Sequence, residues 1–113
     1  MTSAGAAAEE AAARFLAGKG LCLVERNYRC RFGEIDLILR DGGTLVFVEV
    51  RYRRNRAFGG AAESITAAKR GKLLRAARHY MANRGRVPDC RFDAVLLDGD
   101  GGSIEWLVNA FGE

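Results

Sequence analysis

Two acidic residues near the middle of the sequence, Asp36 and Glu49, have the types and spacing that could hold a divalent cation. They lie in "GEIDLILRDGGTLVFVEVR" (residues 33–51), where two apolar runs flank Asp41-Gly42-Gly43. This pattern predicts a β-hairpin. Whether residues 42–43 form a two-residue loop or residues 41–44 a four-residue one, the numbers of paired residues sum to 85. Asp36 is therefore expected opposite Glu49, on one face of the hairpin.

Two carboxylates placed opposite each other repel, because Cβ atoms of directly opposed residues are about 4.5 to 5.5 Å apart. A divalent cation with oxygen ligands would offset the repulsion, and so would a shared proton with one raised pKa or a salt bridge to a nearby base. The simplest alternative is a solvated cluster in which Glu34 pairs with Arg51 and Glu49 with another arginine. The pattern alone leaves all four open.

The other face of the hairpin is predicted to be core, since it is wholly apolar. Its members are Ile35, Leu37, Leu39, Val46, Val48 and Val50. On the acidic face, Ile38 and Phe47 lie between the carboxylates and the turn. The two acids are therefore expected at the rim of a packed layer.

The elements that position these acids can be predicted in order along the chain. Alanine-rich residues 6–17 predict a helix, and residues 21–32 predict a strand before the hairpin at 34–51. A second helix is expected over 67–85, with Ser64 or Thr66 as its cap and Gly85 and Pro88 closing it. Two strands, 90–97 and 103–108, follow. We predict a single α/β domain over residues 1–113, with residues 1–5 disordered and a mixed, largely antiparallel sheet flanked by helices.

Positive charge is concentrated in one part of the chain. Residues 51–86 contain eleven Lys or Arg and one acid, Glu63, although the whole chain has a net charge of only +4. Such a block indicates an anionic partner, with nucleic acid favoured over a membrane surface or a solvated helix face. No apolar run has the length of a membrane helix, and Glu9 and Glu10 fall where a signal peptide would be apolar. A cytoplasmic protein without a membrane partner is expected.

Other kinds of site are disfavoured. A single histidine, His79, leaves no partner for a His-rich metal centre or a histidine-based triad, and it is expected at the surface or half buried. The three cysteines contain no C-x-x-C pair and are expected to be small buried or half-buried residues. The paired glycines match no phosphate-binding loop.

Five motifs together resemble the YraN-like family of small bacterial proteins. They are "ERNYRCRFGEIDLI", "LVFVEVRYR", "AAKRGKLLRAARHYM", "RFDAVLL" and "IEWLVNAF". That family is similar in fold and site layout to the PD-(D/E)xK nuclease superfamily, the restriction-endonuclease-like group that includes Holliday-junction resolvases. The resemblance implies a restriction-endonuclease-like fold made of a helix, a three-stranded antiparallel meander, a helix and two strands.

The resemblance also implies a metal site. Glu9 (or Glu10), Asp36 and Glu49-Val50-Arg51 fall at the positions of the superfamily's helix acid, strand Asp and (D/E)-x-K motif. Asp36 and Glu49, with the Val50 carbonyl and with Glu9 through water, would hold Mg²⁺ or Mn²⁺ against a scissile phosphate. Ile35 stands where the superfamily's name has Pro, which is a minor departure.

A larger departure is Arg51, which replaces the motif lysine. A guanidinium does not deprotonate near neutral pH, so Arg51 cannot act as a general base. It could orient a water or stabilise negative charge on phosphorus, while Lys69 is a candidate to supply the missing amine. The catalytic set is then Asp36, Glu49, Arg51 and Lys69.

Seven basic residues are candidates for neutralising a nucleic-acid backbone. They are Arg53, Arg54, Arg56, Lys69, Arg70, Lys72 and Arg75. Tyr52 and Phe58 could stack on bases, but packing is the expected role of both.

The predicted function is a divalent-metal-dependent endonuclease that hydrolyses DNA phosphodiesters, including those of branched DNA. The alternative is a nucleic-acid-binding module without turnover. A third possibility is a protein-interaction domain with Trp106 and Phe111 as an exposed anchor. Cutting two strands would require a two-fold homodimer, although no hydrophobic stripe demands one.

Overall fold

Five strands form one mixed sheet, and their order in the sheet is their order in the chain, β1-β2-β3-β4-β5. The structure, a computed structural model, describes residues 4–53, 66–82, 89–99 and 103–111. The elements are α1 (Ala4–Gly18), β1 (Cys22–Cys30), β2 (Gly33–Asp41), β3 (Thr44–Arg53), α2 (Ala67–Ala82), β4 (Cys90–Asp98) and β5 (Ile104–Phe111). This confirms the predicted α/β fold class and the predicted succession of elements.

All neighbouring strands are antiparallel except β3 and β4, which are parallel. A parallel pair requires a crossover connection, and α2 supplies it between β3 and β4. β3 therefore lies at the centre of the sheet, with an antiparallel neighbour on one side and a parallel neighbour on the other.

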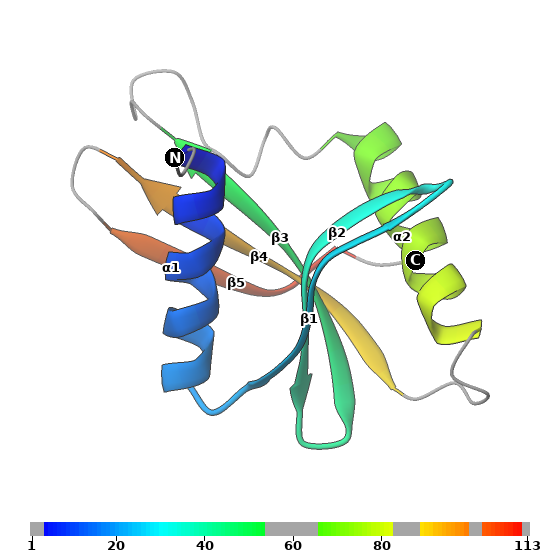
Figure 1. Ribbon diagram of the computed structural model, residues 1–113, viewed down its shortest axis with the longest axis horizontal. Helices are drawn as coiled ribbons and strands as arrows, with labels where there is room; N and C mark the ends of the chain where they lie inside the picture. The colour runs from blue at the N-terminus through cyan, green and yellow to red at the C-terminus, as the bar shows by residue number, and fades with distance from the viewer. Residues whose placement is uncertain (1–3, 54–65, 83–88, 100–102, 112–113) are drawn as a thin grey trace.

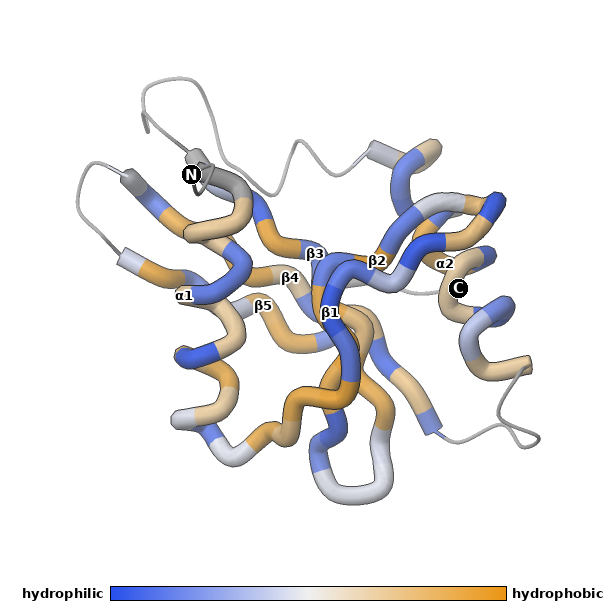
Figure 2. Tube along the Cα trace, in the orientation of Figure 1, coloured by the Kyte–Doolittle hydropathy of each residue, from blue (hydrophilic) through white to orange (hydrophobic). Residues whose placement is uncertain are grey.

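The two helices cover opposite faces of the sheet (Figure 1). On the α1 side, Ala12 and Leu16 pack with Leu39, Val48 and Val95. The core on the α2 side is made by residues of the helix and of the sheet. They are Leu73, Ala76, Ala77, Tyr80 and Met81 of α2, with Ile35, Ile38, Phe47 and Phe92 of the strands. In Figure 2, orange apolar residues follow β3, β4 and β5 between the helices, while blue hydrophilic residues recur along β1 and α2.

The ends of both helices follow from local sequence. α1 begins at Ala4, so residues 4 and 5 are helical although they belong to the stretch 1–5 that was expected to be disordered. It ends before Gly20, whose φ of +97° suits glycine. Thr66 caps α2, because its Oγ1 accepts a hydrogen bond from the Lys69 amide at 3.2 Å. Ser64, Gly85 and Pro88 lie outside the described residues.

The predicted position of Ile35 in β2 was wrong, because the strand twists. Ile35 was assigned to the same apolar face as Leu37 and Leu39, but it packs on the α2 side while those two leucines pack on the α1 side. A regular strand would place all three on one face. The strand therefore rotates between Ile35 and Leu37, at the position of Asp36.

Two smaller predictions have different outcomes. Cys22 and Cys90 are exposed rather than buried, and all three cysteines are free. His79 is half buried, as expected, with its Nδ1 2.5 Å from the Tyr28 hydroxyl. None of the helices that the structure describes has the length and apolar character to cross a membrane.

Candidate active site

The β2–β3 hairpin has the predicted register and ends where the two acids lie. Gly42-Gly43 form a two-residue turn, with Gly42 at a φ of +61°. The paired residues run from Asp41 with Thr44 to Leu37 with Val48, and the numbers of each pair sum to 85. One residue beyond the last pair, Asp36 Oδ2 accepts a hydrogen bond from the Val50 amide at 2.9 Å. A carboxylate thus replaces the next main-chain acceptor, and β2 separates from β3 at this point.

A cavity of about 180 Å³ lies at this separation. Its lining residues come from α1, β2, β3 and α2, namely Ala8, Glu9, Glu34, Asp36, Glu49, Val50, Arg51, Tyr52 and Lys69. The four residues predicted to be catalytic and the three predicted to hold a metal therefore line one cavity. Residues as far apart in the chain as Ala8 and Lys69 meet there, because β3 is flanked by both helices at the point where β2 leaves it.

Glu9 and Glu10 were alternatives for the acid on the first helix, and the structure separates them. Glu10 pairs with Arg26 at 2.6 Å and with Arg14 at 3.5 Å, away from the cavity. Glu9 lines the cavity. Burial and the nearby charge of Asp36 raise the pKa of Glu9, while a hydrogen bond from Asn27 lowers it. Glu9 is therefore the helix acid that faces Asp36.

Glu34 also lines the cavity, although it was not predicted as part of the site. The solvated-cluster alternative paired Glu34 with Arg51, but the Glu34 carboxylate pairs with Arg29 Nε at 3.2 Å across the β1–β2 hairpin. The signal was present in the sequence, because Glu34 lies two residues before Asp36 on the same strand.

Glu49 is almost completely buried, with 5% of its surface exposed. Burial is the largest cause of its raised pKa, followed by a hydrogen bond with the Asp36 carboxyl and by the charge of Asp36; Arg51 acts in the opposite direction. Together they raise the pKa of Glu49 to about 8. A raised pKa on one of the two acids is the shared-proton arrangement, one of the four that the sequence left open for opposed carboxylates.

Two cations lie near Glu49 without forming hydrogen bonds to it. Arg51 Nε is 3.9 Å from Glu49 Oε1, and Lys69 Nζ is 3.8 Å from the same oxygen. Both distances exceed the range of a hydrogen bond. Arg51 Nε is itself buried and has no hydrogen-bond partner among the described residues. A buried N–H donor without a partner is costly, so this donor is available to an oxygen that enters the cavity.

The oxygen donors of the cavity suit a hard divalent cation. In the described parts of the chain, no group of three or more His, Cys, Asp or Glu side chains is arranged to hold a metal ion. Mg²⁺ is commonly held by only one or two carboxylates, with waters and substrate phosphate oxygens filling its other positions. Asp36 and Glu49 match that smaller requirement, and Glu9 is placed to act through water.

The predicted basic residues divide into two groups. Arg70, Lys72 and Arg75 are exposed on α2. Lys69 is partly exposed at the start of the same helix and is the member of this group that lines the cavity. Arg54 and Arg56, the side chain of Arg53, and Phe58 lie outside the described residues.

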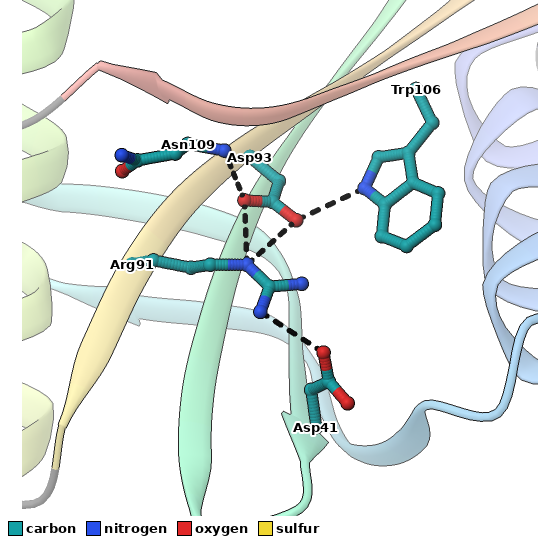
Figure 3. Close-up of polar contacts among 5 residues, drawn as sticks. All are labelled: Asp41, Arg91, Asp93, Trp106 and Asn109. Atoms are coloured by element: carbon teal, nitrogen blue, oxygen red, sulfur yellow. Dashed lines mark hydrogen bonds and ion pairs between the residues drawn. The ribbon is translucent and has the colours of Figure 1, made fainter.

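A second cluster of buried polar groups, centred on Asp93, was not predicted (Figure 3). Asp93 is fully buried. It accepts hydrogen bonds from Arg91 Nε at 3.1 and 3.3 Å, from Trp106 Nε1 at 3.0 Å and from the Asn109 amide at 2.8 Å. Arg91 also bonds Asp41 at 3.0 Å. The donors to Asp93 come from β4 and β5, so the cluster ties β5 to β4.

The same contacts oppose the role of Trp106 as an exposed anchor. Its indole is partly buried, packs against the core on the α1 side and meets the Phe15 ring edge to face. The side chain of Phe111 lies outside the described residues. The interaction-domain hypothesis thus loses one of its two anchors.

Comparison with known proteins places the chain in a family. Residues 8–97 match the uncharacterised protein family UPF0102. A UPF0102 protein of Nitrosospira multiformis is 65% identical over 105 residues, covering 92% of this chain and 88% of that protein. UPF0102 proteins of Nitrosomonas eutropha and Nitrosomonas europaea are 60% and 58% identical, each with 96% of this chain and 93% of the relative covered. The chain belongs to the UPF0102 family, which confirms the resemblance to the YraN-like proteins.

Proposed function

We propose that this protein is a divalent-metal-dependent endonuclease that hydrolyses phosphodiester bonds of DNA, branched DNA included, in the cytoplasm. The observation that supports the proposal most strongly is the cavity at the end of the β2–β3 ladder. It combines carboxylates suited to a hard cation with two cations suited to a phosphate. The resemblance to PD-(D/E)xK nucleases agrees with this assignment.

The residues of the cavity have separable roles in the proposal. Asp36 and Glu49 would hold Mg²⁺ or Mn²⁺, with the Val50 carbonyl beside them and Glu9 acting through water. The bound cation would polarise the phosphoryl oxygen and lower the pKa of the attacking water. Asp36 is held in place by the Val50 amide, and Glu49 must give up its proton to act as a ligand.

Charge on the phosphate would be stabilised by the two cations of the cavity. Arg51 offers a buried N–H that has no partner within the described residues. Lys69 reaches the cavity from the first turn of α2. Arg51 remains charged throughout, so it would act by orientation and charge rather than by proton transfer. The exposed cations of α2 would bind the flanking phosphates without regard to sequence.

A nicking assay tests the proposal. Supercoiled and four-way-branched DNA are incubated with the protein in Mg²⁺, Mn²⁺ or EDTA, and each sample is also tested for a mobility shift. We expect metal-dependent nicking that falls at least about a hundredfold in Asp36→Ala and Glu49→Ala, on the scale of losing several kcal/mol of charge stabilisation. Both variants should still shift DNA. Glu10→Ala, which removes a neighbouring acid outside the cavity, should nick like the wild type.

The rival function is a nucleic-acid-binding module without turnover. The replacement of the motif lysine by Arg51 favours it, and so does the small number of clustered acids among the described residues. Equal mobility shifts by all variants without cleavage in any metal would establish this rival. A protein that fails to bind DNA even at low salt would contradict both functions and leave the interaction domain.

A further inference from the structure

A second and larger cavity, of about 340 Å³, lies next to the candidate active site. Ala8 and Tyr52 belong to the walls of both cavities. The second cavity is otherwise lined mainly by apolar side chains, which include Ala7, Ala11, Leu97 and Ile104. A volume of this size is within the range of small-molecule sites, which are typically apolar with a few polar groups. Asp98 and Ser103 supply such polar groups here.

Tyr52 stands between the acidic cavity and the apolar one. It directly follows Arg51, and 45% of its surface is exposed, which is unusual for an aromatic residue beside a core. Its ring packs closely on Gly99: a Cβ atom at position 99 would lie 2.9 Å from Cζ and 3.3 Å from Cε2, and would overlap the hydroxyl. The hydroxyl end of the ring is thus held against Gly99, the residue that follows β4, while 45% of the residue's surface stays exposed.

This arrangement suits a ligand that has a phosphate and a flat apolar group a short distance apart. An aliphatic ligand would fit the apolar walls equally well, but it would leave the adjoining carboxylates and cations without a partner. A nucleotide matches both cavities at once, because its phosphate is anionic and its base has a face that stacks on aromatic rings. Tyr52 was expected to be a packing residue, and its exposure between the cavities is what changes that interpretation.

We propose that the apolar cavity receives one unpaired base of the nucleic-acid strand, with Tyr52 as its stacking partner. This inference rests on the proposed function, since it assumes that the phosphate next to that base lies in the acidic cavity. Taking a base out of a duplex costs a few kcal/mol, and least where the base is already unpaired. The preferred substrate is therefore single-stranded DNA or the unpaired part of a branched molecule.

The test compares two strands that differ only in their bases. A short oligothymidylate and an abasic strand of the same length and charge are labelled, and their binding is measured by fluorescence anisotropy in EDTA. The wild type should bind the oligothymidylate more tightly by about fivefold to 150-fold, the range for stacking one base. Tyr52→Ala should lose most of this preference without weaker binding of the abasic strand. Tyr52→Phe, which keeps the ring, should retain it.

A second pair of variants tests the cavity itself. Ala7 is exposed on α1 and lines the apolar cavity, whereas Ala17 is exposed on the same helix and does not. Leucine is a good helix former, so Ala7→Leu and Ala17→Leu should both fold. Ala7→Leu should reduce the affinity for the oligothymidylate at least fivefold and leave the affinity for the abasic strand unchanged. Ala17→Leu should change neither.

The outcomes separate this inference from the proposed function, because plasmid nicking in Mg²⁺ is measured on the same preparations. A wild type that nicks DNA but binds the two strands equally would overturn the base cavity alone. The same holds if Tyr52→Ala keeps the full preference for bases. If the protein prefers the oligothymidylate in a way that depends on Tyr52 and Ala7 but never nicks DNA, the base cavity is supported and the endonuclease proposal is contradicted.

Discussion

Two buried carboxylates on neighbouring strands, Glu49 in β3 and Asp93 in β4, have opposite surroundings. Asp93 accepts four hydrogen bonds from three residues, all within range and all from its own β4–β5 region. Glu49 has two cations just beyond hydrogen-bond distance and a second carboxyl group beside it. A buried charge is best compensated when it is both paired and hydrogen-bonded; Asp93 meets both conditions, whereas the cations near Glu49 are too far away to donate hydrogen bonds to it.

The difference indicates which of the two clusters can accept a ligand. The Asp93 carboxylate already accepts bonds from Arg91 Nε, Trp106 Nε1 and the Asn109 amide, so a ligand that reached it would have to break existing bonds. Around Glu49, the paired acids leave a position for a cation, and the Arg51 N–H, which has no partner in the described parts of the chain, leaves a donor for an anion. A buried acid is thus a candidate for ligand binding when internal donors do not already satisfy its carboxylate, and burial alone does not identify such an acid.

The largest expected effect on stability is at Asp93. Asp93→Ala leaves Arg91, Trp106 and the Asn109 amide without their acceptor, so we expect a loss of about 3 to 5 kcal/mol in the free energy of unfolding. Urea denaturation followed by the fluorescence of Trp106, the single tryptophan, measures it. Asp41→Ala removes the exposed partner of Arg91 and should lose less than about 1 kcal/mol. Similar losses in both variants would contradict the comparison.

Replacing Glu49 with glutamine is expected to stabilise the protein as the pH rises. The pKa of Glu49 is about 8 in the folded protein against 4.5 ordinarily, so the folded state binds the extra proton. The contribution of Glu49 to the free energy of unfolding therefore falls as the pH rises from about 4.5 to about 8. The glutamine in Glu49→Gln cannot ionise. The free energy of unfolding of this variant should therefore be higher than that of the wild type by on the order of a few kcal/mol at pH 8, and by little at pH 4.5.

Denaturation curves of both proteins in EDTA across this pH window test the prediction. The difference between them should grow with pH and level off above pH 8. A constant difference, or one that shrinks with pH, would show that Glu49 does not share a proton with Asp36 in the folded protein.

The smallest expected effect concerns the cations of α2. Lys69 lies near Glu49 at the cavity, whereas Lys72 is exposed on the same helix and does not line it. Lys69→Ala should reduce the rate of DNA nicking by about tenfold, equivalent to roughly 1.4 kcal/mol. Lys72→Ala should weaken DNA binding modestly, and higher salt should reduce the difference. Equal effects of the two substitutions on the nicking rate would mean that Lys69 acts only as a surface charge.

Much of the site could be predicted because the hairpin is short-range structure. The Gly42-Gly43 turn fixes which residues are paired, and the pairing brings Asp36 toward Glu49. The chain order of helices and strands followed from periodicity and from turn residues in the same way. Lys69 was predicted from its place in the sequence and in the resemblance, and the structure brings it to the cavity.

What could not be predicted depends on contacts that no local pattern specifies. The choice of Glu9 over Glu10 depends on Arg26, which belongs to another element. The face of Ile35 depends on the twist of β2, which a strict two-residue period ignores. The Asp93 cluster left a weak signal, because Arg91 and Asp93 are two residues apart on one strand, but its other donors come from β5.

Separation of β2 from β3 has a consequence for protein engineering. Asp36 accepts the hydrogen bond of the Val50 amide, which would otherwise bond to the main chain of β2. The side chain therefore prevents two more residue pairs from joining the β2–β3 ladder. A β-branched apolar residue at position 36 would favour a longer hairpin. Such a variant would gain main-chain hydrogen bonds and lose the cavity in the same step, because the candidate site occupies a gap between β2 and β3 in the sheet.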